Sequence, residues 1–162
     1  MSSAQAIIEK LHLLPHPEGG YYRETYRAAT SLVMATGASR HVSTAIHYLL
    51  EGADKSHFHR IQSDELWFFH QGQALEVVLI QNGQLVTIVL GNDLAAGEAP
   101  QAVVPAHTWF GARLKNETGF ALVSCTVAPG FDFRDFELAE RAALVQEFPH
   151  LQAVIEQFTR HA

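Results

Sequence analysis

The stretch SHFHRIQSDELWFFHQG, residues 56–72, decides both the fold and the candidate site. It places His57 two residues before His59, and Asp64 and Glu65 follow ahead of a run of large apolar residues. Because side chains alternate across a β-strand, the two imidazoles are expected on the same face. Two imidazoles and a carboxylate from the next strand can converge on a small volume. That arrangement suits a metal ion and general acid/base chemistry equally well.

The chain on both sides of this stretch is rich in β-forming residues separated by short turns. Asn82-Gly83, between two apolar runs, is the strongest hairpin signal in the sequence. Pro129-Gly130 ends the β-rich region. Many short strands with turns at close intervals are typical of a sandwich or a barrel. The sequence therefore predicts an all-β-dominated fold, mostly antiparallel, from about Tyr22 to Val127.

Helical patterns stand at the two ends of the chain. Residues 3–14 carry apolar side chains at helical spacing and are followed by Pro15, which ends a helix. Residues 137–148 and 151–158 have the same periodicity and are separated by Pro149. We expect these helices to cover the outside of the sheets or an open edge.

Composition excludes several classes of partner. The chain has 162 residues, a formal net charge of −6 and 48% hydrophobic residues, which fits one globular domain with a sizeable core. The negative charge argues against a nucleic-acid or anionic-membrane surface. No apolar run approaches membrane-spanning length, and no signal peptide is visible. With a single cysteine, Cys125, we expect a cytoplasmic protein without disulfides.

Two motifs resemble those of a known superfamily. The pattern Gly52…His57-x-His59…Glu65-x6-Gly72 resembles the first motif of the cupins, and PAHTWF, residues 105–110, stands where their second motif falls. Four longer blocks resemble the DUF985 branch, also called cupin_5. These blocks are residues 16–27, 59–72, 104–114 and 123–138.

The resemblance covers almost the whole chain and implies a fold. It implies an RmlC-like double-stranded β-helix, a jelly-roll barrel that is usually assembled as a homodimer. Residues 1–162 would then form a single cupin domain, with a helix at 3–14, a barrel over about 20–128 and C-terminal helices over about 137–160. No particular reaction follows, because related cupins include sugar epimerases, isomerases, oxygenases and ligand-binding proteins without catalysis.

The second motif departs from the cupin pattern at a position that bears on metal binding. A usual cupin metal site has two histidines, a glutamate and a further histidine, and Phe110 occupies the place of the last one. Three candidate ligands remain for a divalent metal, namely His57, His59 and Glu65. A three-ligand site completed by water is chemically feasible. Loss of the fourth ligand equally suits a pocket that holds no metal.

Two functional hypotheses follow. In the first, the protein is an enzyme resembling sugar epimerases and isomerases that acts on a small polar, sugar-like molecule. His59 would be the base, Glu65 or Asp64 its orienting partner, and Tyr22 the acid. In the second, the same pocket binds a small molecule without chemistry. Metal-dependent oxygen chemistry is disfavoured by Phe110. The predicted site consists of His59, Glu65 and Tyr22 as catalytic residues and His57, Trp67, Phe69 and Trp109 as ligand-binding residues.

Structural roles compete with these assignments. The two histidines could cap polar loops or pair with Asp64, and Glu65 could form an ion pair with Arg23 or Arg27. The aromatic residues could belong to an ordinary core, which is the favoured interpretation for Phe110.

Two further elements carry open alternatives. Tyr22, Glu24 and Arg27 could close the pocket or lie on a strand at the edge of a dimer. Cys125 has no activating neighbour in sequence, so we expect a buried, inert thiol.

Overall fold

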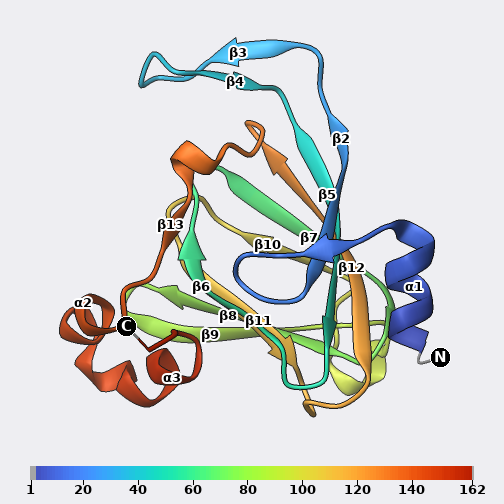
Figure 1. Ribbon diagram of the computed structural model, residues 1–162. Coiled ribbons are helices and arrows are strands. Elements are labelled where there is room, and N and C mark those ends of the chain that lie inside the picture. The colour runs from blue at the N-terminus through green and yellow to red at the C-terminus, as the bar shows by residue number, and fades with distance from the viewer. Residues whose placement is uncertain (1–2, 162) are drawn as a thin grey trace.

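Two antiparallel sheets face each other and carry most of the chain (Figure 1). The structure, a computed structural model, describes residues 3–161. The six-stranded sheet runs in the order β1 (Leu14–Pro15), β2 (Tyr21–Arg27), β5 (Thr44–Glu51), β12 (Phe120–Ala128), β7 (Asp64–Gly72) and β10 (Gln101–Val104). The five-stranded sheet runs in the order β13 (Glu137–Leu138), β6 (Lys55–Arg60), β11 (Trp109–Leu114), β8 (Leu75–Gln81) and β9 (Gln84–Leu90).

The remaining elements are short. A separate hairpin of β3 (Ser31–Val33) and β4 (Ser39–His41) extends beyond one end of the sheets (Figure 1). The helices are α1 (Ser3–Leu11), α2 (Arg141–Glu147) and α3 (Gln152–Gln157), with short 3-10 turns η1 (Leu94–Ala96), η2 (Phe133–Asp135) and η3 (Pro149–Leu151). The prediction of a mostly antiparallel jelly roll with helices at both ends is confirmed. No helix among residues 3–161 is long and apolar enough to cross a membrane.

Alternation along the strands builds the core between the sheets. In β12, Val123, Cys125 and Val127 are buried, whereas the residues between them are half-exposed. The hairpin expected at Asn82-Gly83 joins β8 to β9, and both of its turn residues have positive φ angles, 51° and 73°. Those angles are the ones a two-residue hairpin turn of this kind requires.

The N-terminal helix is shorter than the sequence predicts. It ends at Leu11 rather than at residue 14, because His12 takes a left-handed conformation with a φ angle of 53°. Leu14 and Pro15 then pair with the start of β2. The helix packs on the outer face of the six-stranded sheet against Leu49, which is fully buried.

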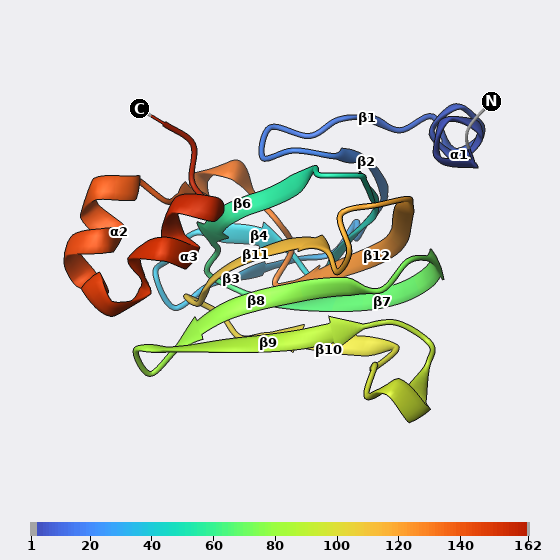
Figure 2. The same cartoon turned by 90° about the horizontal axis from the view of Figure 1, so that it is seen from below.

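The C-terminal helices cover the other sheet (Figure 2). Phe158 stacks on Phe58 of β6 with ring centroids 5.0 Å apart, and both side chains are fully buried. The helical pattern predicted to begin at Glu137 begins only after Glu140. Residues 137–138 instead form β13, which pairs with β6 and so satisfies the backbone groups on the outer side of that strand.

Replacing Phe158 by alanine tests this docking. Phe158→Ala should lower the free energy of unfolding by about 3–5 kcal/mol, because it leaves a cavity between α3 and the sheet. Urea denaturation measures the loss. Leu94→Ala, at a side chain that is 69% exposed, is the control and should change stability by less than about 0.5 kcal/mol. A loss below about 1 kcal/mol for Phe158→Ala would contradict the packing described here.

Candidate functional site

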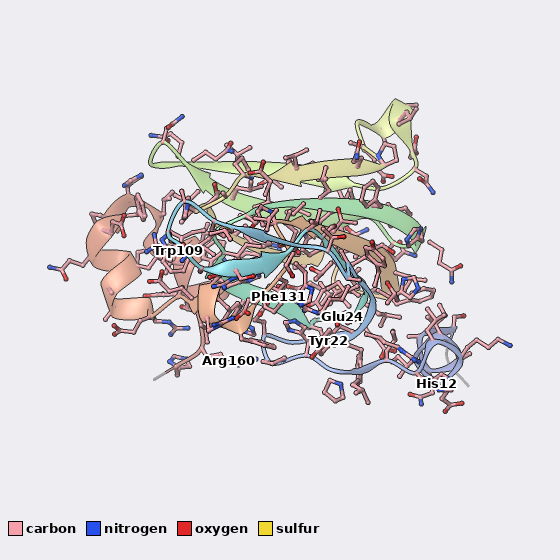
Figure 3. All side chains as sticks on the ribbon, turned by 90° about the horizontal axis from the view of Figure 1, so that it is seen from above. His12, Tyr22, Glu24, Trp109, Phe131 and Arg160 are labelled. Carbon is pink, nitrogen blue, oxygen red and sulfur yellow. The ribbon has the colours of Figure 1, made fainter. Side chains whose placement is uncertain are left out.

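A cavity of about 490 Å³ opens between the two sheets. The deep polar residues that line it are His16, Glu18, Tyr48, Ser56, His59 and Glu65. Tyr22 and Glu24 of β2 and Phe131, which follows β12, also line the cavity and gather over one part of the molecule (Figure 3). The cavity therefore draws its walls from both sheets and from the segment that leaves β12.

A β-bulge in β6 aims His59 into this cavity. Ser56 pairs with Ala112 of β11 and His59 pairs with Phe110, so two residues of β6 stand opposite Gly111 alone. Such a bulge shifts the alternation of side chains by one position. Ser56 and His59 consequently both line the cavity. The backbone N–H and carbonyl of Phe58, inside the bulge, bond to the C-terminal segment instead of to β11.

The same bulge sends His57 elsewhere. The sequence predicts His57 and His59 on one face, which is wrong, because two residues of β6 occupy the space of one. The His57 side chain is half-buried and lines a separate hollow beside the C-terminal residues. Its Nδ1 donates a hydrogen bond to the carbonyl of Glu18 at 2.5 Å.

Glu18 enters the cavity from a glycine-containing turn. Gly19 and Gly20 have φ angles of 116° and 75°. A Cβ added at Gly19 would lie 2.1 Å from the Lys55 carbonyl oxygen, and one at Gly20 would lie 2.6 Å from that of Leu49. Only glycine lets the turn approach β5 and β6 this closely. The Glu18 side chain is thereby held inside, with 4% of the residue exposed.

The protonation of His59 follows from its partners. Its Nδ1 lies 2.8 Å from the carbonyl oxygen of His57 and 3.2 Å from Oε2 of Glu18. A carbonyl oxygen only accepts, so Nδ1 carries the proton and Nε2 holds the lone pair. Burial lowers the pKa of His59 to about 4. At neutral pH the close approach of His59 and Glu18 is therefore a contact between neutral groups rather than an ion pair.

Two buried carboxyl groups, Glu18 and Glu65, line the same cavity as this imidazole. Burial raises the pKa of Glu65 to about 8, and a hydrogen bond with Cys125 offsets part of the effect. Burial also raises the pKa of Glu18 to about 8, and the charge of Glu65 adds to it. Both carboxyls accordingly keep a proton at neutral pH, beside an unprotonated His59.

Aromatic and imidazole groups complete the deep wall. The phenol of Tyr48 donates to the Gly19 carbonyl at 2.5 Å. Burial lowers the pKa of His16 to about 4. Its Nδ1 accepts a hydrogen bond from the backbone N–H of Glu18 at 3.1 Å. The rings of His16 and Tyr22 meet edge-on, with centroids 4.6 Å apart.

The structure brings together only part of the residue set predicted from sequence. His59, Glu65, Tyr22 and Trp67 line the cavity. Phe69 packs against the core between the sheets, and Trp109 packs under the C-terminal helices with Arg60 over its ring. Figure 3 shows Trp109 beside those helices, away from the cavity residues. The expectation that Phe69, Trp109 and His57 share one pocket with the others does not fit this geometry.

The structure also shows where the two arginines considered as partners of Glu65 bind. Arg27 bonds to Glu24, with distances of 2.6 and 3.2 Å, and Arg23 bonds to the carbonyl of Leu11 at 3.5 Å. Neither pairs with Glu65. Asp64 accepts from the backbone N–H of Ala106 at 2.8 Å, so it does not orient His59.

The donor set does not fit a cupin metal centre. His57 points away from His59 and Glu65, and Phe110 fills the place of the missing histidine, with its ring 4.2 Å from that of His59. Within residues 3–161, no three histidine, cysteine or carboxylate side chains converge in a way that could hold a metal ion. The predicted ligand set of His57, His59 and Glu65 is therefore not assembled.

Sequence reasoning missed Glu18, which contacts His59, and His16, which contacts Glu18. Their signal is the segment HPEGG, residues 16–20, where a carboxylate stands beside two glycines. Read as a turn, this segment does not disclose that its carboxylate points inward. Only the contacts of the glycines with β5 and β6 do so.

This double-sheet barrel with a polar cavity between its sheets is a cupin jelly roll. The sequence model of the family described as "Cupin superfamily (DUF985)", Cupin_5, matches residues 5–139, and the chain belongs to that family.

The relatives extend this assignment without adding a reaction. An uncharacterized protein of Saccharomyces cerevisiae is 34% identical over 149 residues, which cover 83% of this chain and 74% of that protein. A protein of Shewanella oneidensis with a crystal structure is 42% identical, with a TM-score of 0.91 over 100% of both chains. A hypothetical protein from Leishmania major is 35% identical, with a TM-score of 0.91 over 99% of this chain and 100% of that one.

A more distant likeness shows the fold alone. Oxalate decarboxylase from Bacillus subtilis has a TM-score of 0.56 at 12% identity, and the match covers 89% of this chain and 36% of that chain. At that identity the likeness concerns the barrel and not its chemistry.

The raised pKa of Glu65 predicts how stability depends on pH. Above pH 6.5 the unfolded chain has released its carboxyl and most imidazole protons, whereas the folded protein still holds a proton on Glu65 until its pKa of about 8. The stability contributed by this neutral carboxyl is complete below pH 4.5, its unfolded value, and is lost as pH rises toward 8. The free energy of unfolding should therefore fall with pH, by about 1.4 kcal/mol per unit for each such group.

Glu65→Gln removes one of these groups. Between pH 6.5 and 8, the variant's free energy of unfolding should fall less steeply than the wild type's, by about 1.4 kcal/mol per pH unit. Urea denaturation at several pH values measures both slopes. Glu147→Gln, on the exposed side of α2, should keep the wild-type slope. Equal slopes in Glu65→Gln and the wild type would show that Glu65 is ionised in the folded protein.

Proposed function

We propose that the protein is an enzyme that binds a small polar, sugar-like molecule in this cavity and moves a proton on it, as isomerases and epimerases do. The observation that carries the proposal is that one cavity holds a buried imidazole, unprotonated at neutral pH, and two buried carboxyl groups that keep their protons. Within residues 3–161, Nε2 of His59 has no hydrogen-bond partner. The side-chain nitrogen and oxygen atoms there that are both fully buried and unpaired are the indole nitrogens of Trp67 and Trp109. Nε2 of His59 is not among them and therefore keeps an accessible surface in the cavity.

The proposed step uses both kinds of group. Nε2 of His59 takes a proton from a carbon next to the substrate's carbonyl, so a C–H bond breaks and an N–H bond forms. The electron pair moves toward the carbonyl oxygen, which receives a proton from a carboxyl, Glu65 being the leading donor and Tyr22 an alternative. Nε2 then returns its proton to carbon, on the other face for an epimerisation or at the neighbouring atom for an isomerisation. An enediol O–H gives its proton back to the carboxylate as the carbonyl re-forms, so both residues regain their starting states. A base and an acid with pKa values moved apart by their surroundings are the requirement for such chemistry.

A second function, binding without chemistry, is favoured by the apolar part of the wall. Trp67, Tyr22 and Tyr48 line the cavity together with Phe131, Phe133 and Phe136. Aromatic walls with a few convergent polar groups are typical of binding sites in general. In that case His59 and the carboxyls only orient the ligand through hydrogen bonds.

Hydrogen exchange into the substrate separates the two functions. Candidate sugars, sugar phosphates and other hydroxycarbonyl compounds are incubated with the protein in D2O, and NMR follows the C–H signals next to the carbonyl. The wild type should introduce deuterium into its substrate. His59→Gln keeps an N–H donor and similar bulk but has no basic nitrogen, so exchange should fall by at least about 100-fold.

His70→Gln provides the matched control, because His70 is exposed on the outer face of the six-stranded sheet, where its Nε2 contacts Ser124. It should exchange at the wild-type rate. A ligand that binds the wild type tightly without any deuterium uptake would support the binding protein instead. Binding and exchange that survive His59→Gln unchanged would contradict both functions for this residue.

We also propose that two copies of the chain associate as a homodimer. The short strand β1 pairs only with Tyr21 and Tyr22, so the rest of β2 has a single strand partner, β5. Tyr26 on β2 is 56% exposed, and Val103 on β10 is 49% exposed. Unpaired strand edges and exposed apolar side chains are common sites of self-association.

Light scattering coupled to size exclusion tests this association at micromolar concentration. The wild type should elute with twice the mass of the chain. Tyr26→Lys places a charge on the strand proposed to contribute to the contact and should shift the population toward monomer. Leu94→Lys, on the exposed turn η1, should not. A wild-type monomer at micromolar concentration would rule the dimer out.

A further inference from the structure

We propose that the ligand of this cavity is a small organic cation, such as a protonated amine carried on a polar or aromatic frame. The inference rests on the proposed function, because it names the charge of the molecule that this same cavity accepts. It excludes phosphates, carboxylates and nucleotide diphosphates as the group held in the deep part of the site.

The deep wall presents two carboxyl groups that have no cationic partner. Glu18 and Glu65 are 4% and 8% exposed. The neighbours that contact their carboxyls are Ser56, His59 and His16 at Glu18, and Cys125 at Glu65. Because burial keeps both imidazoles unprotonated at neutral pH, none of these groups supplies a positive charge. A buried carboxyl without a cation is costly once ionised, and a ligand's ammonium group would remove that cost.

The arginines around the mouth of the cavity already form ion pairs with neighbouring carboxylates. Arg27 makes two hydrogen bonds with Glu24, at 2.6 and 3.2 Å, and a third with the carbonyl of Phe131. Arg134 bonds twice to Asp132, at 2.9 and 2.8 Å. An anionic ligand would therefore have to break an existing ion pair before it gained one.

Two further arginines lie near the site. Arg40 is bound by both carboxylate oxygens of Asp135, each at 2.7 Å. Arg160 lines the separate hollow beside the C-terminal residues and is exposed. Of the influences on the pKa of Glu18, the charge of Arg160 is the weakest. The lining of the cavity itself, counted over the described residues, thus has four carboxyl groups, at Glu18, Glu24, Glu65 and Asp132, and one arginine.

Aromatic rings provide the second attraction for a cation. Trp67, Tyr22 and Tyr48 line the cavity, and Phe131, Phe133 and Phe136 form a contiguous group at its rim. The centroid of the Phe131 ring lies 5.0 Å from that of Phe133 and 6.5 Å from that of Phe136. Ring faces attract ammonium groups electrostatically, whereas they repel anions. The deep carboxyl groups and the aromatic rings around them therefore both favour a positively charged ligand.

A cation must displace protons from the carboxyls that receive it. Glu18 and Glu65 hold protons at pH 7, so an entering ammonium group converts one or both to carboxylates and lowers their pKa. The charged and titratable groups around them that take part in this balance are His16, His59, Tyr48, Cys125, Asp132, Arg160 and the Arg27–Glu24 pair. Binding should release protons and should strengthen as pH rises from 6 to 8.

Matched probes of different charge on one frame test the inference. On a pyranose frame the probes are 2-aminoethyl glucoside, 2-hydroxyethyl glucoside and carboxymethyl glucoside, and on a phenyl frame they are benzylamine, benzyl alcohol and benzoate. Titration calorimetry measures binding at pH 6.5 and 7.5 in two buffers of different ionisation enthalpy, which gives the number of protons released. In at least one frame the cation should bind about tenfold or more tightly than the neutral probe, with proton release and no binding of the anion.

Variants locate the effect. Glu65→Gln and Glu18→Gln should each weaken binding of the cation by about tenfold and reduce the proton release, whereas Glu147→Gln on the surface of α2 should change neither. The inference is overturned if the neutral or anionic probe binds at least as tightly as the cation in both frames, or if no cation binds. Should a neutral probe bind and lose its affinity in His59→Gln, the proposed function stands and only the charge assignment fails. Should the cation bind as expected while His59→Gln changes neither binding nor deuterium exchange, the charge assignment stands and the proposed function fails.

Discussion

The bulge in β6 opposite Gly111 is the constraint on which the site depends. It places Ser56 and His59 in the cavity, turns Phe58 toward the C-terminal helices and leaves the carbonyl of His57 free to hold Nδ1 of His59. A Cβ on Gly111 would lie 2.6 Å from the Ser56 carbonyl oxygen and 2.8 Å from the ring of Phe158. A larger residue at position 111 would therefore displace β6 at Ser56 and the rings of Phe58 and Phe158.

Burial has opposite consequences for the two kinds of ionisable group in the cavity. It disfavours the charged form of each, so it raises the pKa of Glu18 and Glu65 while it lowers that of His16 and His59. The cavity therefore holds acids that keep their protons beside bases that lack them. A ligand that enters with a charge changes this balance, and proton movement is thus linked to binding.

The inner surface of the barrel departs from the usual cupin ligand pattern at Phe110 and at His57. Phe110, at the place of a metal-ligating histidine, is fully buried and packs against His59. The histidine that would complete a first motif, His57, is held by the Glu18 carbonyl. Oε2 of Glu18 lies 3.2 Å from Nδ1 of His59. The turn at Gly19-Gly20 thus brings the carboxyl of Glu18, rather than the side chain of His57, next to His59.

The sequence by itself determined the antiparallel barrel, the hairpin at Asn82-Gly83, and the inward positions of Glu65 and Trp67. The antiparallel strands and the hairpin follow from local alternation and turn chemistry, which depend on neighbouring residues only, whereas the jelly-roll barrel follows from the resemblance to the cupins. It predicted helices at both ends but misplaced their boundaries, because the pairing of Leu14–Pro15 and Glu137–Leu138 with distant strands overrides helical periodicity. The tertiary structure alone decided that His57 turns away, that Trp109 and Phe69 pack elsewhere, and that Glu18 meets His59. The turning of His57 and the contact of Glu18 with His59 depend on a bulge and on close backbone contacts between segments far apart in the chain. No periodic pattern in the sequence encodes such contacts.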